Sequence, residues 1–278
     1  MIDILKKIDK NVLLLDIGNV FSKINKSESQ AKLILDSMEL MDYSCMTLSP
    51  TELNIGINTL NSLLSNVSFP IITSNLVYKE DNRPFKERYI IKNFGNISIG
   101  MIGILPEYAI ELISDQKLKK TLIVIPPEKE VEKILSEIRN KVDIIILLSQ
   151  CGYDKTVSLI NNLKGIDIAI SGHKFLSTCS QTNDETNLFQ LKTRGSSFDF
   201  IRMFKDKSGN LYVSDRKSIL LDDNIPSDEK ILKMMKDANI IEPIKNKNEL
   251  EKELNKQLQL TPEGFMKLML EQQKGVNK

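Results

Sequence analysis

The chain alternates short apolar runs with amphipathic segments, a pattern typical of an α/β protein. Runs of strand length are predicted at residues 12–15, 43–48, 69–77, 89–94, 97–105, 142–148 and 166–170. Helical periodicity covers residues 27–41, 128–140 and 154–163, and Ser49 and Glu52 form a capping box that begins another helix. The order of strand and helix through residues 128–170 predicts parallel strands with helices on the outside.

The pattern changes after residue 173. Strands are predicted at 188–192, 198–204 and 211–219, and we expect them to pair antiparallel, with turns at Arg194-Gly195 and at 207–210. From Ser227 onward the chain is predicted to be helical, and Thr261 marks a well-formed helix start. We therefore expect an α/β domain at 1–223 and a helical C-terminal extension at 224–278.

Composition and charge exclude several classes of protein. The 278 residues are 41% hydrophobic and 27% charged, with 38 Lys and Arg against 37 Asp and Glu. This balance predicts no nucleic-acid partner, and no apolar stretch approaches the roughly 20 residues that span a bilayer. The first residues lack a signal-peptide pattern, so a cytoplasmic location is expected as written, or a periplasmic one if the true N-terminus lies upstream. The three scattered cysteines predict reduced thiols.

Two predicted strands each run into a polar cluster at their carboxyl end. The first cluster contains Gln150 and Cys151, and the second contains His173, the only histidine of the chain. Ligands of α/β proteins bind at the carboxyl ends of strands. These two clusters are therefore the candidate functional site.

Four segments carry a resemblance to a known family. They are LLLDIGN (13–19), the stretch from MDYSCM to SNLV (41–77), YIIKNFGNISIGMIGIL (89–105) and the stretch from VDIIILLSQ to SGHKF (142–175). In order and spacing they resemble the calcineurin-like metallophosphatases, specifically the bacterial 5'-nucleotidase/UDP-sugar hydrolase branch. The resemblance implies a four-layer α/β/β/α sandwich, here followed by a C-terminal helical appendage.

The resemblance also implies two divalent cations about 4 Å apart that clamp a phosphate. Few of the family's ligand residues have a counterpart in this sequence. The metal-bridging Asp falls on Asn19, and the Asn ligand falls on Pro50. The catalytic His falls on Thr51, the His of the Ser-His motif on Gln150, and the last His on Phe175. The first motif, Asp-x-His, has no counterpart upstream of residue 13. His173 and Asp16 remain, and the first Asp of this motif is expected to be structural. We therefore expect a degenerate metal site and no cofactor.

The leading hypothesis is a non-catalytic binding or scaffolding module, whose partner is a protein or a small phosphorylated ligand. One alternative is an active phosphoesterase in which Asp16, Asn19, Gln150 and His173 surround one Mn, Zn or Fe ion, with Arg194 holding the substrate phosphate. The other alternative is a thiol redox protein that uses Cys151 beside Gln150 and His173. The candidate catalytic residues are accordingly Gln150, Cys151 and His173.

Overall fold

The computed structural model describes residues 2, 6, 11–21, 28–174, 179–181, 186–192, 197–206, 208–209, 211–221 and 227–239. The chain divides into two units, Met1–Asp228 and Glu229–Lys278. The described part of the second unit contains helix α8 (Glu229–Asp237). The domain boundary expected at residue 223 and the helix start at Thr261 lie outside the described residues, so both stay predictions.

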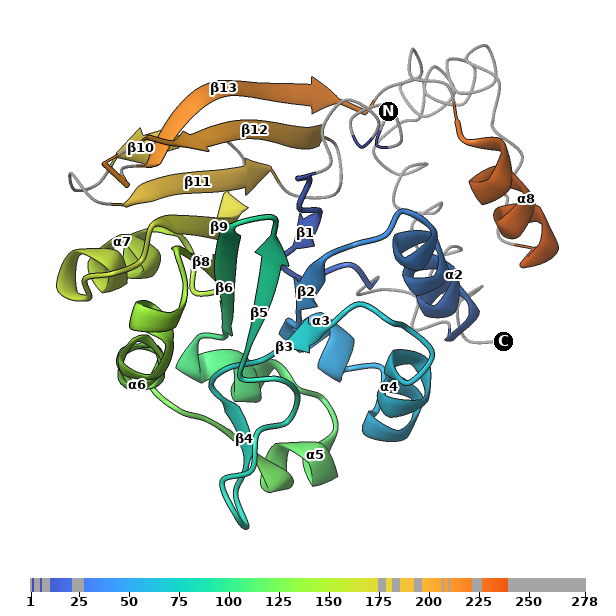
Figure 1. Cartoon of the computed structure of the whole chain (residues 1–278). Helices are drawn as coiled ribbons and strands as arrows, with labels where there is room; N and C mark the ends of the chain where they lie inside the picture. Colours follow the sequence, from blue (N-terminus) through green and yellow to red (C-terminus); the bar gives the residue numbers. More distant parts are fainter. Residues whose placement is uncertain are drawn as a thin grey trace, which may run out of the picture. The chain divides into compact units, whose positions relative to one another are not determined.

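The first unit alternates strands and helices, as the sequence predicts (Figure 1). Its helices are α2 (Glu28–Leu40), α3 (Pro50–Leu53), α4 (Ile57–Leu64), α5 (Gln116–Thr121), α6 (Pro127–Ile138) and α7 (Tyr153–Asn162), with 3-10 turns η1 (Glu107–Leu112) and η2 (Arg139–Lys141). Its strands are β1 (Leu15–Asp16), β2 (Cys45–Thr47), β3 (Ile71–Ile72), β4 (Leu76–Tyr78), β5 (Tyr89–Phe94), β6 (Ile97–Ile104), β7 (Leu122–Val124), β8 (Ile144–Ser149), β9 (Ile168–Lys174), β10 (Cys179–Gln181), β11 (Asn187–Lys192), β12 (Ser197–Lys205) and β13 (Leu211–Leu220).

Two sheets form the centre of this unit. The larger one has the order β10-β11-β9-β8-β6-β5, and the smaller one has the order β1-β2-β3 with parallel pairing throughout. Strands β6, β8 and β9 pair parallel, as the alternation of strand and helix predicts. Strands β12 and β13 form a separate antiparallel ribbon, and β4 pairs with β7.

The sheets and helices make four layers. Helices α6 and α7 pack on one face of the large sheet through residues that recur at helical spacing, such as Val131, Ile134 and Ile138. The other face of that sheet packs against the small sheet through a second apolar cluster that includes Met101 and Ile146. Helices α2 and α4 cover the far face of the small sheet. The expected α/β/β/α sandwich is thus confirmed.

Two details differ from the sequence prediction. The strand expected at 69–77 is split into β3 and β4, because the side chain of Asn75 takes over main-chain bonds: its amide donates to the carbonyls of Leu105 and Ile125 and accepts from the Leu105 N–H. Strand β11 was expected to pair antiparallel; it does so with β10, but it also pairs parallel with β9. This pairing carries β9 beyond residue 170, so that His173 lies on a strand and not after one.

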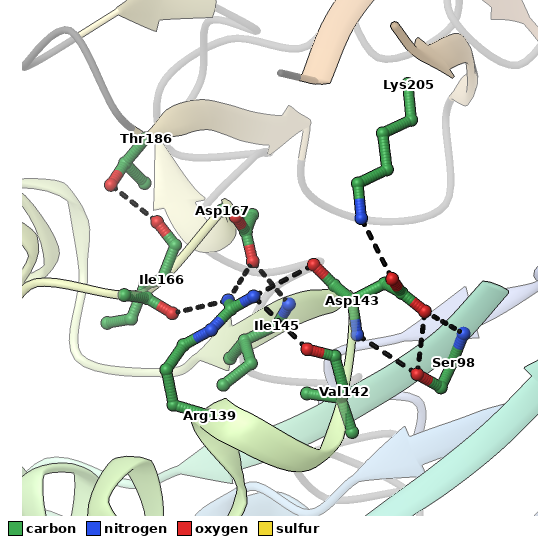
Figure 2. A network of polar contacts seen from close by, with 10 residues as sticks. Ser98, Arg139, Val142, Asp143, Ile145, Ile166, Asp167, Thr186 and Lys205 are labelled. Carbon is green, nitrogen blue, oxygen red and sulfur yellow. Dashed lines mark hydrogen bonds and ion pairs between the residues drawn. The ribbon is translucent and has the colours of Figure 1, made fainter. Parts of the chain in front are cut away.

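A polar network joins the starts of β8 and β9 (Figure 2). The Arg139 guanidinium lies 2.5 Å from Asp167 and donates to the carbonyls of Gly165 and Asp143 at 3.0 and 2.9 Å. The Asp143 carboxylate accepts from the Ser98 N–H and from Lys205 Nζ at the end of β12, both at 2.9 Å. These donors hold the pKa of Asp143 well below its ordinary value. The network fixes the ribbon to the sheet at the edge opposite the candidate site.

Candidate functional site at the strand ends

The loop after β1 begins with a tight turn. Asp16 Oδ1 accepts the N–H of Gly18 at 2.7 Å, and Gly18 and Asn19 both have positive φ, at 84° and 69°. A Cβ on residue 18 would lie 2.6 Å from the Thr47 carbonyl oxygen, so only glycine allows this approach to the end of β2. Burial, with a smaller contribution from Glu52, raises the pKa of Asp16 to about 7.

Helix α3 presents a buried carboxylate to this loop. Ser49 caps the helix, and the capping box with Glu52 that the sequence predicts is confirmed. Glu52 is fully buried and also accepts the N–H groups of Asn19, Val20 and Phe21 at 3.1, 2.8 and 3.2 Å. Hydrogen bonds to an ionised acceptor are among the strongest in proteins. Glu52 therefore fixes the loop that carries Asn19.

The side chains of Asn19 and Thr51 lie next to each other, beside the Glu52 carboxylate. The Thr51 hydroxyl lies 3.1 Å from the Asn19 side-chain oxygen, within hydrogen-bonding distance. Pro50 precedes Thr51 as the first residue of α3 and has no donor atom in its side chain. The Thr51 hydroxyl also lies 2.7 Å from Ser49 Oγ and 3.0 Å from Glu52 Oε1, so the Asn19 oxygen is one of three acceptors around its single proton.

Gln150 and Cys151 follow directly after β8. Gln150 is 2% exposed, and its Nε2 donates to the carbonyl oxygen of Ile17, which links the end of β8 to the end of β1. Its Oε1 has no hydrogen-bond partner among the described residues. The Cys151 N–H donates to the Ser149 hydroxyl, and burial raises the pKa of the Cys151 thiol to about 12. At neutral pH this thiol is protonated, which argues against a reactive thiolate.

The structure thus brings Asp16, Asn19, Thr51 and Gln150 to one edge. His173 lies in β9, but its side chain is outside the described part of the chain, as are Phe175 and Arg194. The roles expected for His173 and Arg194 stay predictions. Sequence reasoning missed a cavity of about 910 Å³ that Asp16, Asn19 and Gln150 line together with Asp199, because no local sequence signal marks a space between distant strands.

The described side chains at this edge do not form a ligand set for a pair of divalent cations. Among the described residues, no group of three or more His, Cys, Asp or Glu side chains lies close enough to hold a metal ion. Within the described ranges, the donors at the edge are the Asp16 carboxyl, the neutral amide oxygens of Asn19 and Gln150, and the buried Glu52 carboxyl behind Asn19. The two amides carry no charge and the Glu52 oxygens already accept main-chain N–H groups, so the described donors compensate little of the four positive charges of two cations.

The layered fold, with a polar edge where β1, β2 and β8 end, is a metallophosphatase-like fold. A solved structure of the calcineurin-like phosphoesterase YfkN from Bacillus subtilis superimposes with a TM-score of 0.70 at 20% identity, and the match covers 90% of this chain and 87% of that one. The structure of a 5'-nucleotidase precursor from Thermus thermophilus matches with a TM-score of 0.74 at 19% identity, over 85% of this chain and 51% of that one.

Sequence comparison agrees with the fold. The chain is 23% identical over 258 residues to the 5'-nucleotidase of Bos taurus, a match that covers 82% of this chain and 44% of that protein. No protein-family profile matches the chain. Its homologues are nevertheless 5'-nucleotidases, so the resemblance found in the sequence is confirmed. The chain spans less than half of the bovine relative. In the described part of the chain, no helix is long and apolar enough to cross a membrane.

Proposed function

We propose that the chain is a binding protein built on the 5'-nucleotidase fold and does not hydrolyse phosphate esters by the two-metal mechanism. The sequence resemblance places Asn19 at the position of the family's metal-bridging carboxylate, and the contacts of Asn19 in the structure carry the proposal. Its amide oxygen lies in hydrogen-bonding distance of Thr51, and its loop is held by Glu52. An amide at this position supplies no negative charge to two cations.

The test is a joint measurement of metal content and turnover. The purified protein is dialysed against Mn²⁺ and then against metal-free buffer, bound Mn, Fe and Zn are quantified by mass spectrometry, and hydrolysis of AMP and p-nitrophenyl phosphate is assayed. We expect well under one metal ion per chain and no turnover above buffer. Near-stoichiometric metal, or turnover that His173→Ala abolishes, would overturn the proposal.

The second candidate function is phosphoester hydrolysis with an altered metal set. It is favoured by the 5'-nucleotidase names of the relatives. In this case Asp16, Asn19, Gln150 and His173 would surround a single Mn, Zn or Fe ion. The same assay distinguishes the two, because this alternative requires turnover that depends on added metal. The cytoplasmic location expected from the sequence stays a prediction.

A further inference from the structure

The cavity of about 910 Å³ in the first unit lies between the large sheet and the ribbon of β12 and β13. Its volume is typical of small-molecule sites, which measure about 300–1,000 Å³. Alternate residues of β12 face it, and of these Ile201 and Met203 pack against the apolar cluster of the large sheet. The sheet itself contributes Ile146, Ile168 and Ile170. Two walls of the cavity are therefore largely apolar.

Two contacts fix the direction of β12 over the large sheet. At the end of β12, Lys205 Nζ lies 2.9 Å from Oδ1 of Asp143, the residue directly before β8 (Figure 2). Earlier in β12, Ile201 pairs with Arg216, whose guanidinium carbon lies 5.5 Å from the centre of the Phe189 ring in β11. Arg216 itself is outside the lining of the cavity. The two contacts together show which part of the sheet each end of β12 covers.

The register of the sheet relates the second contact to β8. Phe189 pairs with Ile170, and Ile170 pairs with Leu148 near the end of β8. Strand β12 therefore runs antiparallel to β8, with its last residue at the start of β8 and its earlier residues toward the end of β8. Asp199 consequently lies at the end of the cavity where Gln150 follows β8.

This end of the cavity has hydrogen-bond acceptors without donors. Gln150 is 2% exposed, and its Oε1 has no partner among the described residues, whereas its Nε2 is used by the carbonyl oxygen of Ile17. Oδ1 of Asp199 is likewise buried and unpartnered in the part of the chain that the structure describes. The carboxyl of Asp16 lines the same end, beside Ile17. Because a buried acceptor without a donor is costly, the occupant is expected to supply N–H groups.

The charges of the lining favour a cation at this end. Of the described lining residues, Arg202 and Lys205 are basic. Lys205 forms its ion pair at the opposite end, and the exposed Arg202 guanidinium carbon lies 5.6 Å from the centre of the Phe200 ring. The side chains of Asp16 and Asp199 are carboxyl groups, so this end attracts an ammonium group and repels a phosphate or a carboxylate.

We propose that the cavity binds a primary amine with a long apolar chain, whose ammonium group donates to Gln150 Oε1 and to the carboxyl groups of Asp16 and Asp199. A primary ammonium group has three N–H donors, one for each of these side chains. The chain lies along the apolar face of the large sheet, so that affinity rises with each methylene removed from water. The inference rests on the proposed function as a binding protein and names the class of its ligand.

The probes are butylamine, hexylamine and octylamine, with three controls that keep the octyl chain. Octyltrimethylammonium keeps the positive charge and has no N–H donor, octyl phosphate reverses the charge, and octanol has one neutral donor. Isothermal titration calorimetry measures binding to the full chain. We expect octylamine to bind roughly tenfold more tightly than hexylamine, because two more methylenes are buried. Each control is expected to bind at least about tenfold more weakly than octylamine.

The position of the bound amine is read from the methyl NMR signals of isoleucine. Octylamine is expected to shift the signals of Ile146, Ile168 and Ile201, which line the cavity. The signals of Ile134 and Ile138, which pack on the opposite face of the large sheet, should not move. This readout separates binding in the cavity from adsorption of the alkyl chain elsewhere on the surface.

Two variants test the two ends of the cavity. Asp199→Asn keeps the shape of the side chain and removes its charge, so it should weaken octylamine binding about tenfold. Asp215→Asn, on β13 outside the lining, removes the same charge and should bind as the wild type does. Ile201→Phe adds volume to the apolar part and should abolish octylamine binding, whereas Ile219→Phe, also outside the lining, should not. Circular dichroism and thermal unfolding check that each variant folds.

Four results overturn the proposal: octylamine does not bind below about 1 mM, a control binds as tightly as octylamine, Asp199→Asn binds as the wild type does, or the shifted signals lie away from the cavity. Metal content and turnover are measured on the same preparation. Absence of amine binding in a protein without metal or turnover refutes this inference alone, whereas metal-dependent turnover refutes the proposed function.

Discussion

The raised pKa of Asp16 predicts an unusual dependence of stability on pH. The carboxyl is partly buried at the end of β1, and its pKa of about 7 in the folded protein compares with an ordinary value of 3.8. Because the folded state holds this proton more tightly than the unfolded state does, Asp16 contributes stability that is fully present below pH 4. That contribution is lost as the pH rises from about 4 to about 7.

The size of the effect follows from the shift. A difference of about three pKa units, at about 1.4 kcal/mol per unit, corresponds to about 4 kcal/mol of unfolding free energy. Asp16→Asn removes the titration and keeps a side-chain oxygen for the N–H of Gly18. The variant is therefore expected to match the wild type near pH 4 and to exceed it by about 4 kcal/mol at pH 8.

Urea unfolding followed by circular dichroism at pH 4, 5, 6, 7 and 8 measures both proteins. Asp81→Asn is the matched control, because Asp81 also accepts the N–H of the residue two positions on, Arg83, but in an exposed turn. Asp81→Asn should not reproduce the gain of about 4 kcal/mol that is expected for Asp16→Asn at pH 8. Parallel profiles for Asp16→Asn and wild type would show that Asp16 is not held neutral, and the reasoning from burial would be wrong.

Three further predictions concern the contacts that frame the site. Glu52→Gln replaces an acceptor of four main-chain N–H groups by an amide and should lower the unfolding free energy in urea by about 2–4 kcal/mol. Arg139→Lys cannot reproduce the forked contacts of the guanidinium and should cost about 1–3 kcal/mol, whereas the exposed Arg83→Lys should cost almost nothing. In a Cys179→Ser background, Cys151 should not react with iodoacetamide in the folded protein at pH 8; rapid labelling at pH 6 would revive the redox alternative.

The layers of the fold could be predicted because each helix and strand has a pattern of apolar residues in its own local sequence. The period of α6 and the apolar run of β8 are readable without tertiary information, and the alternation between them fixes parallel pairing. The split between β3 and β4 could not be predicted. It depends on Asn75 bonding to Leu105, thirty residues away, and no local pattern encodes that contact. The parallel pairing of β11 with β9 could not be predicted for the same reason, because the partner of a strand depends on contacts with the whole sheet.

The site was predicted in part. Alignment of motifs placed Asp16, Asn19, Thr51 and Gln150 at one edge, where the structure brings them together. No local pattern indicated that Glu52 holds three N–H groups of a loop more than thirty residues earlier, because the capping box accounted for this residue by itself. The cavity lined by β1 and β12 could not be predicted from the sequence either, because it depends on how far apart the two strands lie in space.

In the loop after β1, the residues that fix the main-chain conformation differ from those at the positions of the family's metal ligands. Gly18, Asp16 and Glu52 set its conformation through main-chain contacts with the ends of β1 and β2. The positions that correspond to metal ligands of the family, such as Asn19 and Gln150, contribute bonds that neutral side chains can make equally well. Substitution at the ligand positions therefore leaves the loop conformation intact. This separation explains how the chain keeps the fold of the 5'-nucleotidases with neutral side chains at residues 19 and 150.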